Sequence, residues 1–203
     1  MPMSGLVLGL AFDTDANASN PLALVASAPA WASIASAWVG HMDSYMTFGP
    51  LGLVCPAAGG PLTGATTLGG TMSAATLGTA LAKAALAPAS APQWTPIAQA
   101  FITYVIATAV VTPGGTLLAA VGSPTAGGPL TGTAAISGLV GSALGDVMST
   151  AAGTITDAVS KAAWRAIGAD LVTQIQGTGV AVHGTLAATA GGGPIVIGVG
   201  AIT

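Results

Sequence analysis

A pattern led by tryptophan occurs three times in this chain of 203 residues, and it constrains the fold more than any other feature. Each copy consists of Trp, two variable residues, Ile, a small residue and, after a short gap, two bulky apolar residues. The copies begin at Trp31, Trp94 and Trp164. A unit of about 65 residues that recurs in this way is typical of a repeat architecture.

A second landmark, Gly-Gly-Pro, follows each copy and supports the same division. It ends at Pro61, Pro129 and Pro194, and Leu-Thr-Gly continues the first two copies. We therefore predict three tandem modules, which span residues 1–64, 65–132 and 133–203.

Each module is predicted to contain a helix rich in small residues, a helix that carries the tryptophan, and an extended glycine-rich segment. The fold class expected is mainly α with short Gly-rich β segments. One such unit is too small to bury a core alone, but three units that pack around an axis bury a shared core. We therefore expect a pseudo-threefold arrangement.

Local patterns place several elements within the modules. Residues 71–86 are predicted to form a helix, and a second helix is expected to start at Pro96 because proline favours a first helical turn. The state of residues 4–12, strand or helix, stays open because a short apolar run fits both. Residues 13–21 are predicted to form a polar turn.

Three glycines interrupt a helical series in the third module. Gly141, Gly145 and Gly153 each cost helix stability, by up to about 1 kcal/mol relative to alanine. A helix that keeps them is expected to be kinked or to contact another helix closely.

The repeated aromatic and aliphatic positions are predicted to anchor the core of each module, because each begins an apolar helix face. The alternative is that the tryptophans are anchors at a subunit interface. The candidate anchors are Trp31, Trp38, Trp94, Phe101, Trp164 and Leu171.

The charge content limits the classes of partner. Only 4% of the residues are charged, and the chain contains no Glu. A surface built mainly from Thr, Ser and Gly is better suited to another protein or to lipid than to water. Three basic residues and a net charge of −3 do not neutralise a phosphate backbone, so nucleic acid is excluded as a partner.

The low charge first raises the alternative of a protein that inserts into a membrane or forms a channel. The best candidate span is residues 97–111. This run is shorter than the roughly 20 residues that cross a bilayer, and no flanking Lys or Arg fixes its orientation. Membrane contact therefore remains the second interpretation.

No pattern for catalysis, a metal or a cofactor emerges. His41 and His183 are the only histidines, and neither has the spacing of a metal site with the single Cys55. The run from Asp13 has the opening spacing of a calcium loop, but Leu24 stands where the loop requires Glu. We expect no enzymatic activity and no cofactor.

The rare charges form one cluster, in which Asp157, Lys161 and Arg165 follow one another at intervals of four residues. Residues four apart share a helix face, so opposite charges at this spacing attract. We expect either a solvated ladder or an ion pair between subunits.

The segments after residue 97 resemble small Ala/Gly/Thr-rich proteins encoded in the tail gene clusters of tailed bacteriophages. The similarity lies in an apolar helix, residues 97–111, followed by glycine-rich chain, and in alternating Gly and Val near residues 197–203. It implies a virion structural protein of the tail or baseplate, without chemistry of its own. The implied partners are further copies of the chain and other virion proteins, with assembly in the host cytoplasm.

Overall fold

The structure is a computed structural model that describes part of the chain. The described residues are 5–19, 28–48, 53–54, 60–61, 63–85, 90–112, 118–119, 128–131, 133–177, 180–186 and 200–202. Within these ranges the chain is mainly helical with a few short strands, as the sequence predicts. The helices are α1 (Gly5–Ser19), α2 (Ala28–Tyr45), α3 (Ala74–Ala84), α4 (Ala91–Thr108), α6 (Gly141–Ala151) and α7 (Ala158–Gly177).

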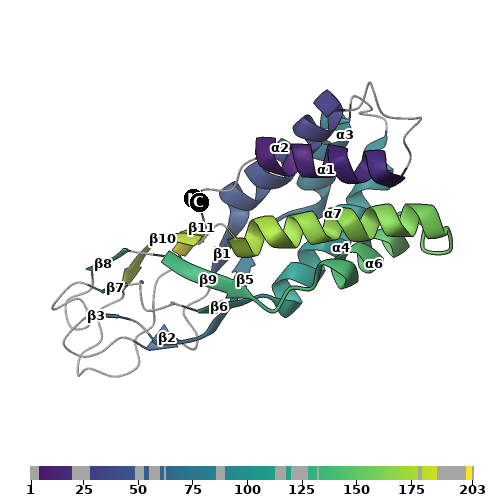
Figure 1. The fold of residues 1–203 in the computed structure, drawn as a ribbon. Helices are drawn as coiled ribbons and strands as arrows, with labels where there is room; N and C mark the ends of the chain where they lie inside the picture. Colours follow the sequence, from purple (N-terminus) through teal and green to yellow (C-terminus); the bar gives the residue numbers. More distant parts are fainter. Residues whose placement is uncertain are drawn as a thin grey trace.

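The helices pack in three pairs of chain neighbours, with α1 against α2, α3 against α4 and α6 against α7 (Figure 1). In each pair, a glycine lets the two helix backbones approach each other closely. A Cβ added to Gly9 would lie 2.6 Å from the Cα of Ala32, and one added to Gly78 would lie 2.7 Å from the Cα of Thr95. A Cβ added to Gly145 would lie even closer to the Cα of Arg165 than in the other two pairs. In every pair the glycine therefore faces the residue that follows a repeated tryptophan.

The three pairs also pack against one another in cyclic order. The second helix of each pair contacts the first helix of the next, so that α2 meets α3, α4 meets α6, and α7 meets α1. Figure 1 shows α1 running alongside α7, although they lie at opposite ends of the sequence. The helical part therefore has a shared interior.

That interior is built from apolar positions at helical spacing. In the first helix of each pair, the residue before the close-contact glycine and the residue one turn later are both buried. These residues are Leu8, Phe12, Leu77, Leu81, Leu144 and Met148. In the second helices, Trp38 and Phe101 contact each other with ring centroids 4.5 Å apart. This contact joins the first pair to the second.

Short antiparallel strands follow the helices. The strands β1 (Met46–Phe48), β6 (Val110–Thr112) and β10 (Val180–Leu186) come after α2, α4 and α7. The strands β5 (Thr66–Gly70) and β9 (Thr133–Ser137) precede α3 and α6, and β11 (Gly200–Ile202) is the last described strand.

These strands are joined in a closed ring. The order is β11-β1-β5-β6-β9-β10, and β10 pairs again with β11. The sheet extends from β10 through β8 (Gly128–Thr131) and β7 (Leu118–Ala119) to β3 (Gly60–Pro61). A separate pair joins β2 (Leu53–Val54) to β4 (Thr63–Gly64).

The ring is attached to the helices through alternate strand residues, as expected for a strand with one buried face. Leu68 in β5, Val111 in β6 and Ile136 in β9 are all buried in the same core as the helices. The helical and strand layers therefore share one apolar interior.

Side chains near the ends of two helices hold the start of the next pair. The Nε2 atom of His41 in α2 accepts a hydrogen bond of 3.2 Å from the backbone N–H of Ser73, the N-cap of α3. The hydroxyl of Tyr104 in α4 accepts from the N–H of Val140, the N-cap of α6, at 3.0 Å and donates to its carbonyl at 3.1 Å. We call these two contacts the latches.

Several local predictions need correction. Of the predicted polar turn at residues 13–21, residues 13–19 belong to helix α1, and residues 20–21 lie outside the described residues. Helix α4 starts at Ala91 and not at Pro96, which lies inside the helix, where its missing N–H removes one backbone hydrogen bond. Val110 and Val111 lie in strand β6, although the sequence extends the apolar helix through them.

Other predictions are confirmed. Residues 5–12 are helical, which settles the choice left open for this run. Helix α3 lies within the predicted residues 71–86. Gly141 and Gly145 face Ala169 and Arg165 of α7 at distances that leave no room for a Cβ, so the predicted close contact between helices is present.

Candidate functional site

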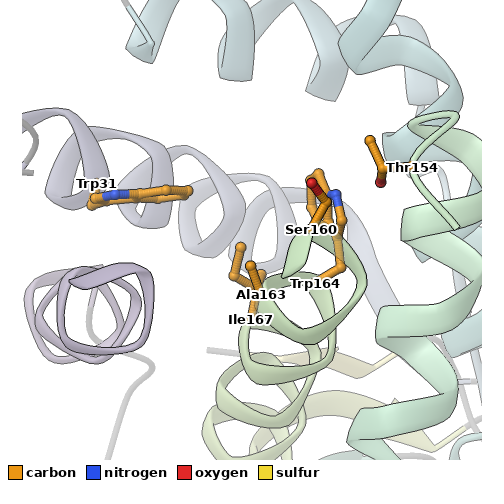
Figure 2. Close-up of a pocket in the computed structure, with 6 residues that line it drawn as sticks. All are labelled: Trp31, Thr154, Ser160, Ala163, Trp164 and Ile167. Atoms are coloured by element: carbon orange, nitrogen blue, oxygen red, sulfur yellow. The ribbon is translucent and has the colours of Figure 1, made fainter. Parts of the chain in front are cut away.

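A mostly apolar pocket of about 210 Å³ lies between α2 and α7, and it is open to solvent on one side. Its lining residues are Trp31, Thr154, Ser160, Ala163, Trp164 and Ile167. Figure 2 shows Trp31 reaching from α2 toward the turn of α7 that carries Ala163 and Ile167. Two of the three repeated tryptophans therefore line one pocket.

Two residues that line the pocket, Trp31 and Ile167, also take part in the packing of the core. The ring of Trp31 packs edge-on against buried Phe12 of α1, with ring centroids 5.8 Å apart and planes at 75°. Trp164 and Ile167 belong to α7, and Ile167 is buried in the core. The pocket is therefore formed by side chains whose positions the core determines.

The hydroxyl groups that line the pocket already have partners. The Oγ1 of Thr154 lies 3.0 Å from the Oγ of Ser149. The Oγ of Ser160 donates a hydrogen bond to the carboxylate of Asp157. No charged residue is among the described residues that line the pocket. The pocket is therefore suited to an uncharged apolar group.

The six predicted anchor residues fall into two classes of exposure. Trp38, Phe101 and Leu171 are fully buried. The three leading tryptophans are partly buried and pack against the core from its edge; they are Trp31, Trp94 and Trp164. The leading tryptophans therefore have a face that another group can contact.

The charged cluster has a partner that the sequence analysis did not include. Arg165 forms two hydrogen bonds with the carboxylate of Asp146 in α6, at 2.7 and 2.8 Å, and the Nζ of Lys161 lies 3.9 Å from the same carboxylate. The hydrogen bond from Arg165 is the main reason why the pKa of Asp146 is lowered. Lys161 and Arg165 of α7 thus connect this helix to α6.

Asp157 was predicted to pair with Lys161 and Arg165, but in the structure it forms hydrogen bonds with Ser160. Its carboxylate accepts hydrogen bonds from the backbone N–H and the hydroxyl of Ser160, in the first turn of α7. The hydrogen bond from the hydroxyl is the main reason why the pKa of Asp157 is lowered, and the bond from the backbone N–H adds to it. The structure thus places Asp157 at the start of α7, while the two cations pair with Asp146. An ion pair across a subunit boundary stays a prediction.

The described titratable residues do not gather into a metal site. No group of three His, Cys, Asp or Glu residues able to hold a metal occurs among the described residues. Burial lowers the pKa of His41, which favours the neutral ring that accepts a hydrogen bond in the latch. Burial raises the pKa of Asp43. Cys55 lies outside the described residues, and His183 is part of β10.

An apolar stripe on α1 is the most exposed hydrophobic feature among the described residues. Leu6 is 75% exposed, Val7 is 61% exposed and Leu10 is 68% exposed. Leu6 and Leu10 are four residues apart and therefore share one side of the helix. We call these two side chains the α1 knob.

The sequence did not reveal the knob or the full lining of the pocket. Residues 5–12 are apolar on every side of the helix, so periodicity does not distinguish the buried Leu8 from the exposed Leu6. Thr154 and Ala163 belong to no recognisable sequence motif. The repeated tryptophans were the signal that pointed toward the pocket.

None of the described helices is long and apolar enough to span a bilayer. Comparisons with protein-family models, with curated proteins and with solved structures find no match.

Proposed function

We propose that this protein is a structural subunit of a phage or phage-like virion, in the tail or baseplate, and that it acts by packing against other subunits. The observation that carries the proposal is the exposed apolar stripe on α1. Large apolar side chains that cluster on a surface mark a site of contact with another protein or with a membrane. Leu6, Val7 and Leu10 form such a cluster.

The charge distribution supports contact with protein. Only nine residues of the 203 are charged, six acidic and three basic. Among the described residues, Lys161 and Arg165 are already paired with Asp146. A surface with so few charges disperses poorly as a monomer, whereas burial between subunits removes that disadvantage.

We also propose that the chain consists of three tandem repeats of about 65 residues, related by a pseudo-threefold axis. Three observations support this. The glycines at the helix contacts recur next to each leading tryptophan. The helix pairs contact one another in cyclic order. The strands that follow the pairs close into one ring.

Expression without detergent, followed by sedimentation and mass measurement, tests the function. We expect a soluble fraction that forms discrete or growing oligomers, or that joins purified virion particles. Protein that is found only in membranes and released only by detergent would contradict the proposal. That result would favour a protein that inserts into membranes or forms a channel.

A further inference from the structure

The pocket between α2 and α7 and the knob on α1 match in their chemistry. The pocket is apolar, and its hydroxyls are already hydrogen-bonded within the chain. An occupant with a charge would lose its hydration, and no charged residue among the described lining residues would compensate for that loss. An aliphatic side chain carries no such cost.

The pocket is also large enough for such a side chain. A cavity of about 150 Å³ suffices for a benzene-sized apolar molecule. The pocket here measures about 210 Å³. Its tryptophan walls offer large, rigid apolar contact area, which is the kind of surface where binding energy concentrates in protein interfaces.

The α1 knob provides the aliphatic side chains on the same molecule. Leu6 and Leu10 are exposed, so neither fills the pocket of its own chain. They lie one helical turn apart, so they form a pair that can enter a groove together. The knob carries no charge, and Asp13 lies further along α1.

We propose that copies of this chain associate head to tail, with the α1 knob of one copy inserted in the pocket between Trp31 and Trp164 of the next. This inference rests on the proposed function and adds the partner and the contact. Knob and pocket are different surfaces of one molecule, so after one contact forms, one copy keeps a free pocket and the other keeps a free knob. Such a contact builds a ring or a filament from identical subunits.

A mixing experiment with two variants tests this contact. Leu6→Ser with Leu10→Ser removes the knob and keeps the pocket. Ala163→Phe fills the pocket and keeps the knob. In sedimentation we expect the unmodified chain to grow in mass with concentration, whereas each variant alone stays a monomer. An equimolar mixture should give a species of two chains and nothing larger. One variant supplies the only intact knob and the other the only intact pocket, so both are used up in a single contact.

Controls separate this contact from general effects of substitution. Val140→Ser removes another exposed apolar side chain, 54% exposed, outside the knob, and it keeps the backbone bonds to Tyr104. Its association should match that of the unmodified chain. Thermal unfolding shows that each variant is folded. The smaller change Ala163→Leu replaces Ala163→Phe if the latter does not fold.

Two outcomes overturn the inference. If the chain with a filled pocket associates as the unmodified chain does, the knob binds elsewhere; the inference then fails while the structural function stands. If the unmodified chain is a monomer at all concentrations, self-association is absent. Binding of that monomer to purified particles then decides separately whether the structural function stands.

Discussion

At the scale of single residues, the closest contacts of the fold depend on glycine. Gly9, Gly78 and Gly145 each lie against the backbone of the facing helix. The sequence indicated this role only for Gly145, where a helical series was interrupted. Gly9 gave no such signal, because residues 5–12 fitted either a strand or a helix, and Gly78 was not singled out within the helix predicted for residues 71–86.

We expect Gly145→Ala to destabilise the protein. A Cβ at this position would meet the backbone of Trp164 and Arg165, which is not free to move away. Overpacking of this kind costs about 1–3 kcal/mol. The free energy of unfolding in urea measures the loss.

Gly40→Ala provides the matched control for that substitution. Gly40 lies inside α2, and no atom lies within 4 Å of an added Cβ. Alanine there should stabilise the helix by about 0.5–1 kcal/mol. Equal effects of the two substitutions would show that the helices are not in close contact at Gly145.

At the scale of elements, the two latches fix each helix pair to the next. His41 and Tyr104 both project from the second helix of one pair to the N-cap of the following first helix. Each occupies the tenth position after a leading tryptophan. The chemistry differs, since only the imidazole can change its charge near neutral pH.

We expect the stability of the protein to fall as the pH is lowered from 7.5 to 5.5. Burial lowers the pKa of His41 in the folded state below its value in the unfolded chain, so the unfolded chain binds more protons in this range. Protonation also removes the acceptor for the N–H of Ser73. Urea unfolding at several pH values measures the slope.

Two variants isolate the contribution of His41. His41→Gln keeps an acceptor that does not titrate, so most of the pH dependence should disappear. Tyr104→Phe should lower stability by about 0.5–1.5 kcal/mol through lost hydrogen bonds, with the slope unchanged. An unchanged slope in His41→Gln would rule out this latch as the origin of the pH effect.

The helices were predicted better than their ends. Apolar periodicity identified α3 and most of α4, because one face of each helix is buried in the core. The tail of the apolar run became strand β6, since Val110 and Val111 pair with β5 and β9. Such pairing depends on residues distant in sequence, and local periodicity carries no information about it.

The pocket was less predictable than the helices. The sequence marked Trp31 and Trp164 as important but did not place them together, because their meeting depends on contact between the first and third helix pairs. The pairing of Arg165 with Asp146 is of the same kind. Spacing along one helix favoured Asp157, whereas the partner lies on the neighbouring helix.

At the scale of the whole molecule, the closed strand ring and the cyclic helix contacts tie the parts together. We therefore expect one cooperative unfolding transition. Tryptophan fluorescence and far-UV circular dichroism should give the same midpoint and slope in urea. Separate transitions would mean that the helix pairs are stable units by themselves.

A fragment of residues 1–132 gives a second measurement of that cooperativity. It lacks β9, β10 and β11, and it also lacks α7, the neighbour of α1. We expect it to lose the cooperative transition. A fragment that unfolds with the same midpoint as the full chain would contradict the expectation.

The pairing of β11 with β1 has a consequence for synthesis on the ribosome. The ring needs residues 200–202, so one edge of β1, residues 46–48, lacks this partner until residues 200–202 have left the exit tunnel. Contacts this distant in sequence form slowly, and an open strand edge invites pairing with other chains. Nascent copies translated side by side on one messenger are therefore exposed to mispairing, and a chaperone that covers this edge would raise the yield of folded protein.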